Sequence, residues 1–335
     1  MKLTLFRWES RPHIPTTVLS KIHSLFPTAR IHVKNRDRAR SPYGRYDRDM
    51  ALDIDLLRSP QLHSLEIVVL QSGEYNYGPD RTISEFPILK QILLGSSNLR
   101  VLRLGCIQET RYDFAKFAQY YESFNTDGEG PLNLQLQNKD CLPTLVELGI
   151  LKEAHRIYEP GYDLSKAHCI AWKRAMNWKA LRRLDLGNAR PGDFFMVFCG
   201  HIPQLKSLKF RLSCGKDSNE DPAPLLRATI RFLDSVMGLE ELEVADWTRS
   251  FFPSLLSSIA KHGHSLTCLE VNASERGNKN FPGLVEESLT QLLSDLPKLS
   301  TLSLAVDLLK TPRNGWNGSL LWVYSFLLPI PIIAY

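Results

Sequence analysis

Leucines recur along the chain in one pattern, Leu-x-x-Leu-x-Φ, in which Φ is Leu, Ile, Val or Phe. The pattern occurs eight times without overlap, beginning at Leu62, Leu99, Leu145, Leu181, Leu205, Leu239, Leu266 and Leu299. Its last two apolar positions are two residues apart, so they point to one side of a short strand and the residue between them points to the other side. The pattern therefore predicts eight short strands, each with one buried face.

Apolar segments of helical length lie between these strands, at residues 84–94, 170–178, 224–236, 253–260 and 284–296. Two of them follow the helical period, with Leu226, Ile230, Leu233 and Met237 in one and Val285, Leu289, Leu292 and Leu296 in the other. A unit of one strand and one helix cannot bury its apolar side alone, so the units must stack. We therefore expect an α/β solenoid of about nine irregular units.

The opening stretch reads as one more, degenerate unit. Leu3 and Leu5 would lie on a strand, residues 18–26 on a short helix, and Ile31 and Val33 on the next strand. This stretch and the eight motifs resemble the long, uneven leucine-rich repeats of fungal F-box/leucine-rich-repeat proteins. The resemblance covers residues 1–310 and implies a horseshoe with parallel strands on its concave face and helices on its convex face. It also implies substrate recognition for a Skp–cullin–F-box ubiquitin ligase, with the Skp adaptor and cullin as partners.

Two departures from that family matter. The position after each strand that usually holds Asn or Cys is occupied by other residues, such as Leu70 and Asp307, so the turns must be stabilised in another way. The helical bundle of an F-box is also not found, since residues 14–22 resemble only its opening and a strand-like stretch at 30–33 follows. We expect a truncated chain or a repeat-only protein. The alternative function is therefore a free-standing repeat scaffold or regulator without ligase association.

The predicted strands place one set of side chains on the concave face, because these residues alternate with the buried ones. The charged members of this set are Glu66, Arg103, Glu147, Arg183, Asp185, Lys209, Arg211, Glu241, Glu243 and Glu270. Bases and acids mix in the middle of the chain, and acids dominate later. Such rows on a rigid sheet suit recognition of a protein surface by complementary charge, although they also simply solvate an exposed face.

The overall charge adds one local feature. Lys and Arg number 41 and Asp and Glu 36, which leaves +5 and argues against a protein that coats nucleic acid. Residues 34–48 hold six basic and two acidic residues, with Tyr43 and Tyr46 between them, a composition that suits contact with RNA or phosphate. A second nucleic-acid element is missing, so we interpret this segment as a solvated insertion and do not expect nucleic-acid binding.

Candidate chemistry is sparse. The six cysteines are scattered without a C-x-x-C pair, as in proteins of reducing compartments, and no secretory signal opens the chain, so we expect a cytoplasmic or nuclear protein. His262 and His264 form the tightest histidine pair but have no third ligand at metal-site spacing. Nucleotide-binding, hydrolase and zinc-protease motifs are missing. We therefore expect no enzymatic activity, no metal, no cofactor and no small-molecule substrate.

The last 25 residues, 311–335, form a hydrophobic tail that carries almost no charge. Its most apolar run, 320–335, has 16 residues, and a bilayer-spanning helix needs about 20. A membrane tether through this tail is a second alternative function, and a cap on the last repeat is a further interpretation. We favour a third reading, in which the natural chain continues with more repeats.

Overall fold

The computed structural model describes residues 2–9, 13–35, 52–72, 85–109, 132, 134–151, 164–187, 189–212, 223–247, 252–273, 286–305 and 323–327. The chain divides into two compact units, Met1–Leu181 and Arg182–Tyr335, which are described one at a time. The boundary falls inside the stretch 1–310 that the sequence predicts as one repeat domain. Most of the basic insertion, 36–48, lies outside the described residues, as do 311–322 and 328–335 of the hydrophobic tail.

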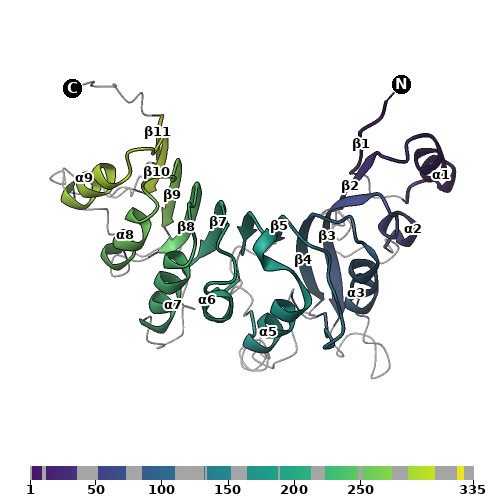
Figure 1. Ribbon diagram of the computed structural model, residues 1–335, viewed down its shortest axis with the longest axis horizontal. Coiled ribbons are helices and arrows are strands. Elements are labelled where there is room, and N and C mark those ends of the chain that lie inside the picture. Colours follow the sequence, from purple (N-terminus) through teal and green to yellow (C-terminus); the bar gives the residue numbers. More distant parts are fainter. Residues whose placement is uncertain are drawn as a thin grey trace, which may run out of the picture. The chain divides into compact units, whose positions relative to one another are not determined.

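The described part of the first unit holds parallel strands that neighbour each other in chain order. These are β1 (Leu5–Trp8), β2 (Arg30–Asn35), β3 (Leu62–Ser72), β4 (Val101–Glu109) and β5 (Glu147–Ile150). One side of them is covered by α1 (Thr16–Leu25), α2 (Ile54–Leu57), α3 (Phe86–Gly95) and α5 (Lys166–Ala175), as Figure 1 shows. A single 3-10 turn, η2 (Trp178–Ala180), follows α5. Parallel neighbours need a crossover connection, and α1, α2 and α3 lie in those crossovers.

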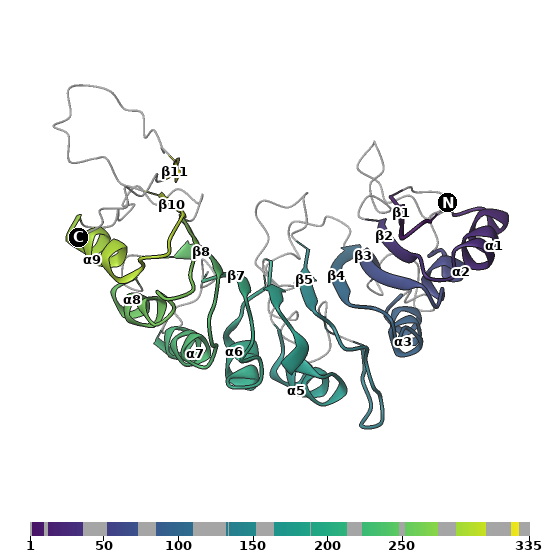
Figure 2. The ribbon, with the colours of Figure 1, turned by 45° about the horizontal axis from the view of Figure 1, so that its top comes forward.

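The second unit repeats this plan. Its parallel strands are β6 (Arg183–Asp185), β7 (Ser207–Arg211), β8 (Glu241–Trp247), β9 (Cys268–Ala273) and β10 (Thr301–Ala305). The helices α6 (Gly192–Phe198), α7 (Ala223–Asp234), α8 (Phe252–Ala260) and α9 (Glu286–Asp295) lie side by side on one face (Figure 2). The chain is thus an α/β protein with open, parallel sheets, as the leucine pattern predicts.

The motif leucines are in register from strand to strand. In the first unit Leu65 pairs with Leu102 and Leu102 with Leu148. In the second unit Leu208 pairs with Leu242, Leu242 with Leu269, and Leu269 with Leu302. All of these side chains are buried. The predicted strand positions are therefore confirmed at each motif, because a one-residue slip would turn every leucine out of the core.

Backbone hydrogen bonds stabilise the turns that lead into the strands. The amide of the first motif leucine donates to the carbonyl three residues earlier, from Leu62 to Ser59 at 3.0 Å, from Leu99 to Ser96 at 3.1 Å and from Leu299 to Leu296 at 3.1 Å. The carbonyl of the residue after that leucine then accepts two amide hydrogen bonds from the start of the next strand. In the second unit the Lys206 carbonyl accepts the amides of Glu240 and Glu241, at 2.8 and 2.9 Å. Side-chain amides add to these bonds in the first unit, where Gln61 donates to the Phe26 carbonyl at 2.6 Å and Asn98 to the Pro60 carbonyl at 2.9 Å.

Aromatic side chains fill the space between α6, α7 and β7. The rings of Phe195 and Phe232 stack at 4.5 Å, and Phe195 meets Phe210 edge-on at 5.1 Å. Phe194 and Phe198 extend this cluster with ring centroids 4.2 Å apart. The sequence does not predict α6, because a seven-residue helix is too short to show a helical period. The four-residue helix α2 escaped prediction for the same reason.

Two sequence-based registers need correction. The sequence predicts Leu3 and Leu5 on one strand, but β1 begins at Leu5, which is 42% exposed. The inward side chains of β1 are Phe6 and Trp8, opposite Ile31 and Val33. On α7 the buried residues are Ala228, Thr229, Phe232 and Leu233, so the predicted stripe is rotated and its last member, Met237, is 67% exposed. The reason is that α7 ends at Asp234, before that position.

One part of the hydrophobic tail is described. Residues Val323–Leu327 form β11, which pairs antiparallel with β10. In the described stretches, every helix is too short or too polar to cross a bilayer. This strand agrees with the interpretation of the tail as a cap on the last repeat, and the membrane-tether alternative stays a prediction.

Candidate functional site

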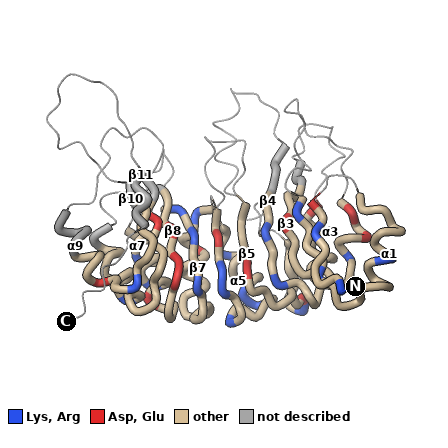
Figure 3. Tube along the Cα trace, turned by 90° about the horizontal axis from the view of Figure 1, so that it is seen from above, with Lys and Arg blue, Asp and Glu red and all other residues tan. Residues whose placement is uncertain are grey.

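We define the strand face as the side of each unit's sheet that lies opposite its helices. All ten charged residues expected on the concave face lie on β3 to β9, at positions that alternate with the buried motif residues. Figure 3 shows acidic and basic positions on neighbouring strands of each unit. Parallel strands in register bring residues far apart in sequence to within about 4.8 Å of one another across the sheet. The strand face is therefore a patterned charged surface in both units.

A three-residue ion network crosses β3, β4 and β5 in the first unit. The Arg103 guanidinium donates to Glu66 Oε2 at 3.1 Å and to Glu147 Oε1 at 2.7 Å. Glu66 lies directly opposite Arg103 in the register, and Glu147 lies on the diagonal, because the residue opposite Arg103 on β5 is Gly149. The two carboxylates are 8% and 13% exposed, whereas the Arg103 side chain is 41% exposed. Arg103 is thus the solvent-exposed member of the network, and the two carboxylates are mostly buried.

Acids prevail on the corresponding row of the second unit. Asp185, Lys209, Glu243 and Glu270 lie opposite one another on four consecutive strands. Lys209 Nζ donates to Glu243 Oε2 at 2.7 Å, and this hydrogen bond, helped by the neighbouring carboxylates, raises the pKa of Lys209 above its ordinary value. One ammonium faces three carboxylates, so this row keeps a negative excess.

Cys268 lies in the row next to these acids. Partial burial, together with the charges of Glu241 and Glu270, raises the pKa of the Cys268 thiol. A reactive cysteine needs the opposite shift, because the thiolate is the nucleophile. The surroundings of Cys268 therefore favour the neutral thiol over the thiolate.

A histidine pair on β2 and β3 was not found from the sequence. The rings of His32 and His63 stack with centroids 5.5 Å apart and planes at 19°. The register between the two strands shifts at this point, since Ile31 pairs with Leu62 whereas His32 pairs with Ser64. His63 is the extra residue of this β-bulge. A sequence pattern with a strict period of two does not reveal a bulge, so it could not bring the rings together.

Basic neighbours surround the pair. Partial burial lowers the pKa of His32, and the nearby His63, Arg7 and Arg30 lower it further. Partial burial also lowers the pKa of His63, and Arg30 and Arg100 act in the same direction, whereas a hydrogen bond with the Asn98 backbone opposes the shift. Both imidazoles are therefore mostly neutral at pH 7, in a positively charged environment.

The His262–His264 pair has a structural use. His262 is buried, and its Nε2 lies 3.2 Å from the Leu233 carbonyl, while His264 is exposed. Burial lowers the pKa of His262. Across the stretches that the structure describes, no group of three or more His, Cys, Asp or Glu side chains is placed to hold a metal ion.

Comparisons with known proteins do not assign this chain to a family. No family model matches it, and no curated protein does so.

Proposed function

We propose that this chain is a leucine-rich-repeat solenoid that binds another protein on its strand face, which is the concave face of such a solenoid. The observation that carries this proposal is the pairing of charged rows with an uncovered sheet face. In the part of the chain that the structure describes, the helices lie on the opposite side of each unit (Figures 1 and 2). A surface of this kind supplies charge complementarity at fixed spacing.

The backbone ladder supports the same function. Each described strand of the second unit from β6 to β10 is held by its neighbours, and the helices pack beneath, so the strand-face side chains start from fixed Cα positions. Fixed positions lower the entropy that must be lost on binding. Repeat proteins use the extended inner surface of the stack for binding.

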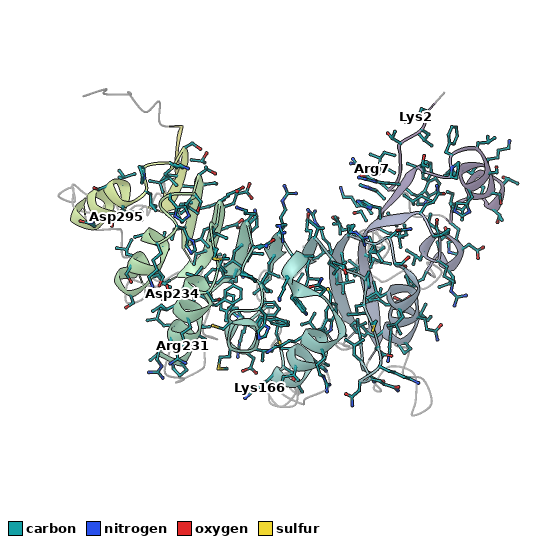
Figure 4. The ribbon with its side chains drawn as sticks, viewed as in Figure 1. Lys2, Arg7, Lys166, Arg231, Asp234 and Asp295 are labelled. Atoms are coloured by element: carbon teal, nitrogen blue, oxygen red, sulfur yellow. The ribbon has the colours of Figure 1, made fainter. Side chains whose placement is uncertain are left out.

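The test is a comparison of two charge-reversal variants of the full chain. Arg183→Glu/Lys209→Glu changes the strand face, and Arg227→Glu/Arg231→Glu makes the same charge change on the helix side of the same unit. Figure 4 shows Arg231 on α7, on that side. Proteins captured from extracts of the source cells are quantified by mass spectrometry, and the strongest one is purified for direct titration. We expect a tenfold or larger loss of affinity only in the strand-face variant. Equal affinities of the two variants would overturn the proposal.

Association with a Skp–cullin ubiquitin ligase is a narrower form of this proposal, and it rests on the family resemblance. Most of the F-box-like stretch 14–22 lies in α1, between the parallel strands β1 and β2. The same capture experiment decides the matter. Enriched Skp adaptor and cullin would support a substrate receptor, whereas other enriched proteins alone would support a free-standing scaffold or regulator.

A further inference from the structure

The bulge on β3 places an unusual group of side chains on the strand face of the first unit. It aims His63 at His32, and the two rings stack at 5.5 Å. Arg7 on β1 is the register partner of His32 on β2, so its side chain lies on the next strand of the same row. Figure 4 shows Arg7 on the side of β1 that faces away from α1. Bulges that redirect a side chain are frequent at functional sites.

Positive charge dominates around the two rings. β1 contributes Arg7, and Glu9 follows directly after this strand; their charged atoms are 3.6 Å apart, and both side chains are well exposed. β2 contributes Arg30 and Lys34, which are both exposed. Glu9 offsets the charge of Arg7, so Arg30 and Lys34 supply the net positive charge. An ion pair as exposed as Arg7–Glu9 contributes little free energy, so Arg7 can exchange Glu9 for a carboxylate of a ligand.

The next two strands contribute both acidic and basic side chains. β3 contributes Glu66, which Arg103 of β4 already holds at 3.1 Å. The chain before β4 contributes Arg100, whose guanidinium donates to the carbonyls of Ser97 and Leu99. The charges that shift the pKa of either imidazole most belong to neighbouring basic groups, His63, Arg7 and Arg30 for His32 and Arg30 and Arg100 for His63.

We propose that Arg7, Arg30, His32 and His63 form a subsite that binds the carboxylates of an acidic segment of the protein partner. The stacked rings form a small platform with N–H donors at its edges, and the two guanidinium groups flank it. Arginine binds carboxylates through paired hydrogen bonds, and a doubly protonated imidazole donates from both nitrogens. This inference rests on the proposed function, because it names the chemistry of the partner.

The subsite is also pH-responsive. Without ligand, burial and the surrounding bases keep the imidazoles neutral at pH 7. A bound carboxylate favours the imidazolium form, so binding takes up protons. By linkage, affinity then rises as the pH falls, by up to about tenfold per pH unit for each proton taken up. Glutamate side chains of a ligand stay ionised at pH 5.5, because their pKa is about 4.3.

The test uses the full chain and a fluorescent octaglutamate peptide, with affinity measured by anisotropy at pH 7.5 and 5.5 in low salt. We expect at least a fivefold tighter complex at pH 5.5, in accord with proton uptake by one or two imidazoles. His32→Asn/His63→Asn should abolish the pH dependence, and Arg7→Gln/Arg30→Gln should weaken binding at both pH values. The matched control, His201→Asn/His264→Asn, removes two exposed histidines of the second unit and should behave as the unaltered chain. Circular dichroism checks that each variant is folded.

Three results would overturn the inference: no binding at pH 5.5, binding that ignores pH, or full binding by the variant with all four residues replaced. The last result would assign the peptide to other bases, such as those of segment 36–48. These failures are distinct from failure of the proposed function. The capture experiment reports on Arg183 and Lys209 in the second unit, so either result can stand while the other falls.

Discussion

The stem of Arg103 lies directly over Gly149, so closely that a Cβ at position 149 would meet Arg103 Cγ at 3.1 Å. The missing side chain makes room for the arginine to cross β5 and reach Glu147. Glycine weakens a strand, yet here it permits the ion network of the strand face. The network and the glycine should therefore behave as one unit.

Gly149→Val should uncouple this network. In the unaltered chain, we expect Arg103→Ala to cost about 1–2 kcal/mol of unfolding free energy, because it leaves two covered carboxylates without that guanidinium. In the Gly149→Val background, the same substitution should cost less than half as much, since the added side chain has already displaced the arginine. Urea unfolding of the four proteins measures this. Equal costs in both backgrounds would show that Gly149 does not position Arg103.

Neighbouring residues on β7 should differ sharply in importance. Leu208 is fully buried, so Leu208→Ala should lower the free energy of unfolding by about 2–5 kcal/mol. The Lys209 side chain is 46% exposed, and solvent screens its ion pair. Lys209→Ala should therefore lower the free energy of unfolding by less than about 1 kcal/mol. The two unfolding curves test the register directly. Similar losses would mean that the strand is assigned one residue out of step.

Stability should fall on mild acidification. His262 is buried neutral, and burial places its pKa in the folded chain below its value in the unfolded chain, which is about 6.5. The unfolded chain therefore binds more protons, and the stabilisation present above about pH 6.5 is lost as the pH falls below that value. The free energy of unfolding, measured between pH 8 and 5.5, should decrease for the unaltered chain. His262→Asn should be less stable at pH 8 but show a shallower slope. The exposed-site control His201→Asn should retain the slope of the unaltered chain, because His201 is not among the groups that shift the pKa of His262.

Gly263 should not tolerate alanine. A Cβ there would lie 2.1 Å from the Asp295 carbonyl oxygen, and the backbone at the end of α9 would have to move. Overpacking of this kind costs about 1–3 kcal/mol. Gly95→Ala is the matched control, because a Cβ at that position meets nothing within 4 Å. Thermal unfolding of the two variants should separate them, and a stable Gly263→Ala protein would contradict the close approach of α9.

The leucine pattern predicts the strands well because a period of two, repeated eight times, leaves few alternatives for the buried side. It cannot predict which strand-face residues meet. The Glu66–Arg103–Glu147 network depends on register between residues 37 and 44 positions apart, and on a glycine whose use is visible only in space. The His32–His63 stack depends on a bulge, which breaks the very period that the prediction uses. Short helices such as α6 have too few turns to leave a pattern.

β11 bears on how copies of this chain can meet. The outer edge of a parallel sheet presents unpaired amides and carbonyls, on which a strand from another molecule can add. β11 occupies that edge of β10, from the Thr301–Leu327 pair to the Ala305–Val323 pair, with the opposite strand direction. A second molecule arriving there meets a reversed strand. Head-to-tail polymerisation by extension of the parallel sheet is therefore blocked at β10.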